Sequence, residues 1–149
     1  MTSTKPDPRP LGIPFVVMAW GLAGLIPFLG LPVLAILVPG LSTWTDQALA
    51  LYAAVILSFL GGARWGREVG SAMPDARLIA MSMAPSVAAW GLILLPEAWA
   101  GLKLPGLALA LILHLAWDFG AKGLPPWYPR LRLILTAGAV LGLALGAFI

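Results

Sequence analysis

The stretch ARWGREVGSAMPDAR, residues 63–77, decides how the chain is organised, because it places three arginines between two long apolar stretches. With these three, every basic residue except Lys103 lies in an alternate gap between five apolar stretches; the eight residues are Lys5, Arg9, Arg64, Arg67, Arg77, Lys122, Arg130 and Arg132. Cytoplasmic loops of membrane proteins retain Lys and Arg. The alternation therefore predicts five membrane spans, with the N-terminus inside and the C-terminus outside.

Composition agrees with a membrane protein. The chain is 60% hydrophobic and 10% charged, against roughly 25% charged residues in a soluble domain. Its net charge of +3 comes from basic residues dispersed at span ends, so no single basic face indicates a nucleic-acid partner. The absence of cysteine excludes disulfides, thiolate metal sites and cysteine nucleophiles.

A bilayer core of ~30 Å needs about 20 helical residues. The sequence predicts an all-α membrane protein, a bundle of five transmembrane helices, with spans at 13–34, 47–66, 77–95, 104–121 and 130–149. Residues 1–10 are expected to form a disordered cytoplasmic tail, and residues 11–149 a single transmembrane domain. The first apolar run is longer than the core of a signal peptide, so we expect the first span to be retained.

Prolines make the first span irregular. Because proline removes a backbone donor and clashes with the preceding turn, we expect a kink or an end near Pro27–Pro32. Residues 31–41 are then expected at the outer surface, with Trp44 in the following loop as an interfacial anchor.

Two glycine series repeat every four residues, a spacing that lets helix backbones approach closely in lipid. They are Gly62, Gly66 and Gly70 in the second span and Gly138, Gly142 and Gly146 in the fifth, with a similar strip at Ala80, Ala84 and Ala88. Contacts within the bundle and a dimer or partner-docking face both fit this spacing.

His114 and Asp118 are the most suggestive polar pair, since they lie four residues apart on one face of the fourth span. Ionisable groups within a span usually face the bundle interior. A proton relay, axial ligation of a haem or chlorophyll by His114, and a polar cross-link between helices all remain open. We expect Arg64 or His114 to lie within hydrogen-bonding or one-water reach of Asp118.

Catalysis and metal binding have little support. One His and two carboxylates near the spans do not make up the three or four ligands that zinc needs. Three serines, Ser58, Ser82 and Ser86, lie in spans, but no elbow motif accompanies them. The sequence predicts no catalytic residue, no metal, no cofactor and no enzyme activity.

Two motifs indicate a family. The stretch YAAVILSFLGGARWG, residues 52–66, and the stretch PPWYPRLRLILT, residues 125–136, resemble the transmembrane-protein-69-like family, a domain of unknown function in bacteria and mitochondria. The resemblance implies a five-helix bundle, a multi-pass location in the bacterial inner membrane, and importance for Arg64, Trp65, Trp127, Tyr128 and Arg132. It supplies no established activity or substrate.

Aromatic and basic residues are expected to form a collar at the inner interface, where amphipathic rings and arginines anchor helices. The collar comprises Trp65, Arg67, Arg77, Trp127, Tyr128 and Arg132. The basic members, together with Arg64, fit either a rim that binds lipid phosphate or an acidic partner, or long side chains that simply reach for water.

Our leading hypothesis from the sequence is an accessory or assembly subunit, in contact with the lipid bilayer, that docks onto a larger energy-transducing complex, respiratory or photosynthetic. It rests on the lack of catalytic groups, the lack of an extramembrane domain and the small-residue helix faces. The alternative is a binder or carrier of a quinone or lipid near His114, Asp118 and Arg64. A proton-coupled transporter ranks third, because five spans without a visible repeat do not match the repeated architecture of transporters.

Overall fold

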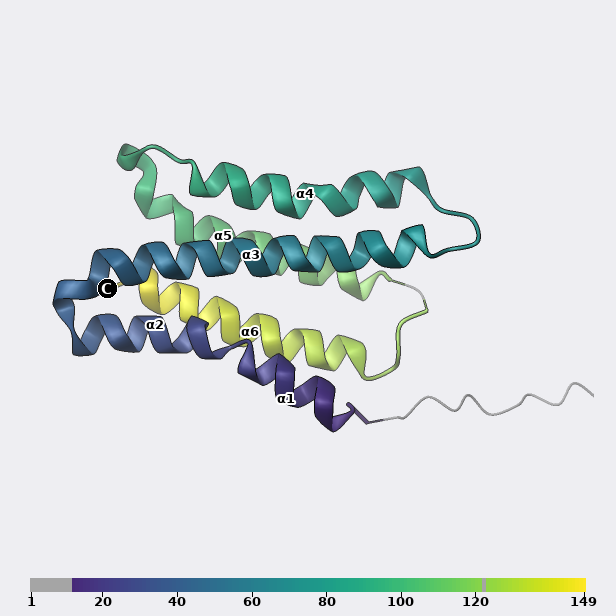
Figure 1. Ribbon diagram of the computed structural model, residues 1–149, viewed down its shortest axis with the longest axis horizontal. Helices are drawn as coiled ribbons and strands as arrows, with labels where there is room; N and C mark the ends of the chain where they lie inside the picture. The colour runs from purple at the N-terminus through teal and green to yellow at the C-terminus, as the bar shows by residue number, and fades with distance from the viewer. Residues whose placement is uncertain (1–11, 122) are drawn as a thin grey trace, which may run out of the picture.

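The computed structural model describes residues 12–121 and 123–149, and every regular element within them is helical. Figure 1 shows the course of the chain, with helices α1 (Phe15–Ala23), α2 (Ile26–Leu37), η1 (Pro39–Leu41), α3 (Ser42–Val69), α4 (Ala76–Ile93), η2 (Glu97–Leu102), α5 (Lys103–Phe119) and α6 (Tyr128–Ala147). The expected tail at residues 1–10, with Lys5 and Arg9, and the basic residue Lys122 lie outside the described residues.

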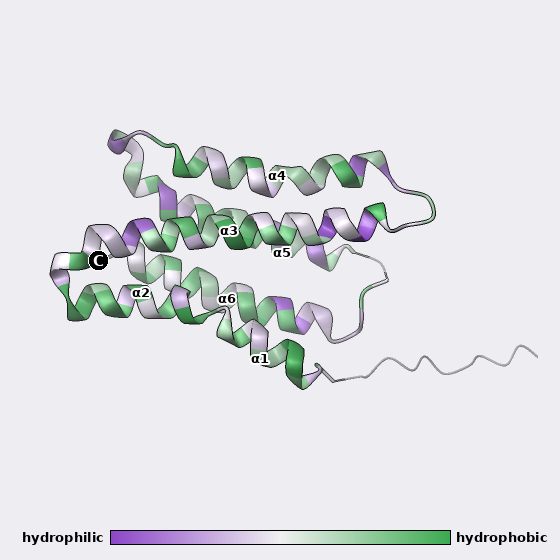
Figure 2. Cartoon of the chain, viewed as in Figure 1, coloured by the Kyte–Doolittle hydropathy of each residue, from purple (hydrophilic) through white to green (hydrophobic). Residues whose placement is uncertain are grey.

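Five stretches of the described residues are long and apolar enough to cross a membrane: Phe15–Leu37, Pro39–Val69, Ala76–Ile93, Glu97–Phe119 and Tyr128–Ala147. The predicted all-α fold with five spans is confirmed. Figure 2 shows hydrophobic residues along the helices and hydrophilic residues gathered where α3, α5 and α6 approach the α3–α4 and α5–α6 loops. The orientation relative to the cytoplasm stays a prediction from the Lys and Arg distribution.

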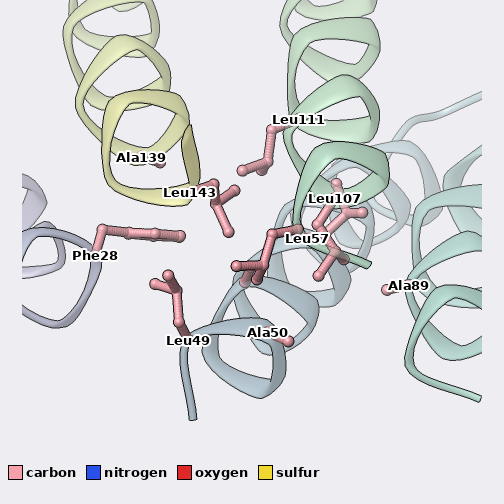
Figure 3. Close-up of a cluster of buried hydrophobic side chains, with 11 residues drawn as sticks. Phe28, Leu49, Ala50, Leu57, Ala89, Leu107, Leu111, Ala139 and Leu143 are labelled. Atoms are coloured by element: carbon pink, nitrogen blue, oxygen red, sulfur yellow. The ribbon is translucent and has the colours of Figure 1, made fainter. Parts of the chain in front are cut away.

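The longest helix, α3, is the centre of the bundle and packs against α2, α4, α5 and α6. At one edge, α4 packs on α3 and α5, while α1 lies at the opposite edge against α6 (Figure 1). Side chains from α2, α3, α5 and α6 meet between the helices (Figure 3), including Phe28, Leu57, Leu111 and Leu143. This core holds α5 and α6 against each other and against α3.

The first span differs in detail from the prediction. It consists of two helices, and the break falls at Gly24 and Leu25, before Pro27 rather than between Pro27 and Pro32. The Tyr52 hydroxyl on α3 donates a hydrogen bond of 2.9 Å to the Gly24 carbonyl. A side chain therefore satisfies the hydrogen-bond acceptor of the backbone at the break. Pro27 suits the first turn of α2, where its missing N–H costs nothing.

Residues 31–37 continue α2, with Pro32 inside the helix, and their place at the outer surface stays a prediction. One further expectation for this region is wrong. Trp44 lies in the first turn of α3, not in a loop, although its side chain is exposed. The connection itself is only the short helix η1.

The α3–α4 turn is held by polar contacts to its backbone. The Asp75 side chain caps α4 by accepting a hydrogen bond of 2.8 Å from the Arg77 backbone N–H. The Glu68 carboxylate accepts a second one, also 2.8 Å, from the Asp75 N–H. These contacts fix the end of α3 that carries Arg64.

Candidate functional site

Asp118 is the centre of a buried polar cluster near the C-terminal end of α5. Its Oδ2 atom accepts a hydrogen bond of 2.7 Å from Nε of Arg132, which lies in the second turn of α6. Asp118 is 4% exposed and Arg132 6%, so both charges are removed from water and lipid. Buried charges of this kind are usually paired, and here the pair joins two helices.

His114 adds a second contact to the same carboxylate. Its Nδ1 atom lies 3.5 Å from Asp118 Oδ2 and 3.5 Å from Nη2 of Arg132. The ring also packs edge-on against Trp117, with centroids 5.5 Å apart. The other ring nitrogen, Nε2, is buried and has no hydrogen-bond partner in the described part of the chain.

Arg64 approaches the cluster from α3. Its Nη1 atom is 3.8 Å from Oδ1 of Asp118, and its guanidinium lies 4.0 Å from the centroid of the Trp117 ring. Such a stacked arginine is attracted by the face of the indole. Three helices therefore converge on one carboxylate.

Both residues that the sequence predicts beside Asp118 are close to it. Arg64 and His114 both lie within 3.8 Å of Asp118. The shortest contact, however, comes from Arg132, which the sequence placed in the interfacial collar. Arg132 is buried because α6 is rotated so that this side chain faces α5. The side chain of its neighbour Arg130 is exposed instead.

The rest of the collar is more open. Trp65, Arg67 and Arg77 are exposed, whereas Trp127 and Tyr128 are half-buried, with ring centroids 6.3 Å apart. Trp117 was missed as a site residue, although its place between His114 and Asp118 on one helix was a usable signal.

The two glycine series behave differently. A Cβ atom on Gly142 would collide with the Phe28 carbonyl. One on Gly138 would lie 2.6 Å from the side chain of Leu25 in the α1–α2 break, and one on Gly146 would lie 2.6 Å from the side chain of Leu49 on α3. The Phe28 carbonyl is the group that Pro32 deprives of its helical N–H partner, so the close approach of Gly142 occurs where α2 is locally unbonded. The second series thus lines contacts within the bundle.

The first series does not line such contacts. A Cβ on Gly62 or Gly66 would meet no other atom of the described residues within 4 Å, and Gly70 approaches only its own helix. The neighbouring Gly61, which was not singled out, is instead the contact point with α4, where an added Cβ would lie 2.6 Å from the Ser82 carbonyl. The alanine strip at Ala80, Ala84 and Ala88 is likewise exposed.

An apolar cavity of about 170 Å³ adjoins the cluster and is partly open at the surface of the bundle. Its wall is formed by residues of α1, α2, α3, α5 and α6 and by the α1–α2 break: Trp20, Gly21, Gly24, Leu25, Phe28, Ile56, Phe59, Leu60, Leu111, Arg132, Leu135, Thr136 and Ala139. Apart from the indole N–H of Trp20, the polar side chains in this wall are those of Arg132 and Thr136, and the Thr136 hydroxyl is buried without a partner among the described residues.

Thr136 was quoted in a family motif but not identified as a site residue. The sequence feature that could have identified it is its position four residues after Arg132, which places both side chains on one face of α6.

A second, wider cavity of about 520 Å³ lies at the opposite end of the bundle, lined in part by Asp46, Glu97 and Lys103. His114 lines neither cavity.

Metal ligands are not grouped in the described residues, where no set of three His, Cys, Asp or Glu side chains is arranged to hold an ion. The chemistry that the site offers is hydrogen bonding at the end of an apolar cavity. The cluster can orient a polar group, and the cavity can enclose an apolar one.

Comparison with known proteins gives a consistent picture. A family model described as "Protein of unknown function (DUF3429)" matches residues 13–148. The chain is 40% identical over 130 residues to "Transmembrane protein 69" of Xenopus tropicalis, which covers 83% of this chain and 50% of that protein. It is 39% identical over 126 residues to "Transmembrane protein 69" of Mus musculus, covering 77% of this chain and 48% of that protein. The chain thus spans about half the length of the curated relatives it matches, and no solved structure matches it.

Proposed function

The chain belongs to the DUF3429 family, the transmembrane-protein-69-like family that its two motifs predicted, and we propose that it binds a small lipophilic molecule within the membrane. The ligand occupies the apolar cavity beside Arg132 and Thr136. This is the alternative that the sequence ranked second, but its site is moved from His114, Asp118 and Arg64, which do not line the cavity, to the adjoining face of α6.

One observation carries the proposal: an apolar cavity of about 170 Å³ that is partly open at the surface of the bundle and has Arg132 and Thr136 in its wall. Binding sites for small molecules typically combine apolar walls with a few polar groups that fix orientation. A lipophilic ligand would fill this apolar space.

The proposal is tested by purifying the full chain in mild detergent and extracting bound molecules for mass spectrometry. We expect one lipophilic molecule per chain. Ile56→Trp fills the cavity from α3 and should release the molecule, whereas Val55→Trp, at the adjacent exposed position, should retain it. A wild-type preparation without a stoichiometric molecule, or equal retention by the two variants, would contradict the proposal.

The membrane that contains the protein is also proposed. The family resemblance and the Lys and Arg distribution support a bacterial inner membrane. Separation of inner and outer membranes, followed by detection of the chain in the inner fraction, tests this location. Recovery in the outer fraction would refute it.

A docking role is a second candidate, favoured by the open surface at Gly62 and Gly66. Small residues facing away from the bundle leave room for a foreign helix to approach closely. In this role the chain would be an accessory or assembly subunit of a larger membrane complex. Gly62→Leu should reduce co-purification of such a complex without lowering the melting temperature, because a Cβ atom added at Gly62 meets nothing within 4 Å outside the backbone of its own helix. Unchanged co-purification would count against docking at this surface.

A further inference from the structure

We propose that the wider cavity, at the end of the bundle that carries η1 and η2, binds an amphiphile whose head group has both a phosphate and a primary ammonium, as phosphatidylethanolamine has. This site is separate from the apolar cavity beside Arg132, so it does not depend on the function proposed above. Its volume of about 520 Å³ falls in the range of roughly 300–1,000 Å³ that is typical of small-molecule sites.

The wall of this cavity changes from polar to apolar along the bundle. On α3 it is formed by Thr43, Asp46, Gln47, Ala50 and Leu51, whose spacing is that of one helix face. The three polar residues lie at the start of α3, and the two apolar ones follow about one turn further in. An occupant would therefore place a polar head at the end of the bundle and an apolar part toward its middle.

The neighbouring helix repeats this order. Lys103 is the first residue of α5 and is followed by the apolar Leu104, and both line the cavity. The cavity is partly open, and Leu51 in its apolar part is 47% exposed within a membrane-spanning stretch. An acyl chain attached to the head could therefore pass Leu51 into the bilayer.

The polar part of the wall carries charges of both signs. Two carboxylates and one ammonium line it, those of Asp46, Glu97 and Lys103. Unlike in the first cavity, polar atoms form a large part of the exposed wall. Within residues 12–121 and 123–149 none of these three side chains forms an ion pair or a hydrogen bond, and none has a buried charged atom. All three charges are therefore available to a ligand.

Burial of the charges indicates the class of head group. Asp46 and Lys103 are half-buried, whereas Glu97 is exposed and can stay hydrated. A charge that loses part of its hydration is stabilised by a partner of opposite sign. A phosphate would accept hydrogen bonds from Lys103, and a primary ammonium would donate one to Asp46. One zwitterionic head supplies both partners.

Other head groups satisfy only part of the wall. Phosphatidylglycerol would pair with Lys103 but bring an unbalanced phosphate close to two carboxylates, and like charges placed together weaken binding. An alkylammonium would pair with the carboxylates and leave Lys103 facing a like charge. Phosphatidylcholine is zwitterionic, but its quaternary nitrogen has no N–H to donate to Asp46.

The test adds an equimolar mixture of dioleoyl phosphatidylethanolamine, phosphatidylcholine and phosphatidylglycerol to the full chain in detergent, and native mass spectrometry measures the retained lipid. We expect phosphatidylethanolamine to exceed each of the others by about threefold or more. Lys103→Gln should lower the retention of phosphatidylethanolamine and phosphatidylcholine alike, by about threefold to tenfold. Asp46→Asn should instead bring the ratio of these two lipids close to one. Arg130→Gln, exposed at the opposite end, should change neither quantity.

A steric pair of variants assigns the retained lipid to this cavity. Gly101 in η2 lines the cavity and Gly40 in η1 does not, yet both are exposed, and a Cβ added to either meets nothing within 4 Å beyond its chain neighbours. Gly101→Trp should release phosphatidylethanolamine and Gly40→Trp should retain it, with equal melting temperatures when no lipid is added. Ile56→Trp, which fills the first cavity, should leave this retention unchanged, so the two sites are distinguished.

Four results would overturn the inference. Equal release of lipid by Gly101→Trp and Gly40→Trp would mean that the cavity is not the site. Equal retention of the three lipids in the fraction that Gly101→Trp removes would show that the head group is not recognised. Preference for phosphatidylglycerol, unaffected by Asp46→Asn, would assign the site to an anionic lipid. Displacement of phosphatidylethanolamine by dodecylammonium, with tighter binding to Lys103→Gln, would assign it to a cationic amphiphile.

Discussion

Nε of Arg132 donates a hydrogen bond of 2.7 Å to Oδ2 of Asp118, and this contact joins the second turn of α6 to the last turn of α5. His114 and Arg64 approach the same carboxylate from α5 and α3. Arg132 also lines the cavity, as does Thr136, which lies one turn further along α6.

Loss of the Asp118 carboxylate should destabilise the bundle. Asp118→Ala leaves two arginines facing each other without an anion, and breaking a buried pair in this way costs about 3–5 kcal/mol. Asp118→Asn keeps a hydrogen-bond acceptor and should cost clearly less. Thermal unfolding in detergent measures both, with the exposed Glu97→Gln as control. Equal losses for Ala and Asn would show that the hydrogen bonds at this position contribute nothing.

Glycine substitutions should separate the two series. Gly142→Ala forces a methyl group against the Phe28 backbone and should lower the free energy of unfolding by about 1–3 kcal/mol. Gly62→Ala points into open space and should stabilise α3 by up to about 1 kcal/mol, because alanine is the better helix former. Denaturant titration in mixed micelles provides the measurement. A neutral Gly142→Ala would mean that α2 and α6 do not approach as described.

Topology can be read by cysteine labelling, since the chain has no native cysteine. Single cysteines at Met73 and Pro125 should be protected from a membrane-impermeant reagent in intact cells. Cysteines at Trp44, Leu102 and Ile149 should react. Labelling at Met73, whose side chain is 86% exposed in the protein, would refute the inside placement of the α3–α4 loop.

The hydroxyl of Tyr52 should stabilise the break in the first span. Tyr52→Phe removes the donor to the Gly24 carbonyl and should cost about 0.5–1.5 kcal/mol. Amide hydrogen exchange should accelerate in α1, which otherwise packs mainly on α6, more than in α4. Unchanged exchange in α1 would indicate that packing alone holds the break.

Part of the candidate site was predictable from local spacing. His114 and Asp118 lie four residues apart on one helix, so their shared face follows from helix geometry. The partnership of Asp118 with Arg132 was not predictable in this way. It depends on how α6 is rotated against α5, and the sequence alone placed Arg132 with the interfacial arginines. The same rotation decides that Thr136 faces the cavity.

The sequence by itself determined the number of spans and their approximate limits, because these depend on apolar length and on the positions of charged residues along the chain. The tertiary structure decided which faces meet. Gly62 and Gly142 belong to series with identical spacing, yet only Gly142 touches a neighbouring helix. The reason is that lipid tails are as apolar as leucine, so a lipid-facing and a buried surface need not differ in hydropathy. Helix rotation is set by close packing and by a few buried polar contacts, which exist only once the helices are assembled.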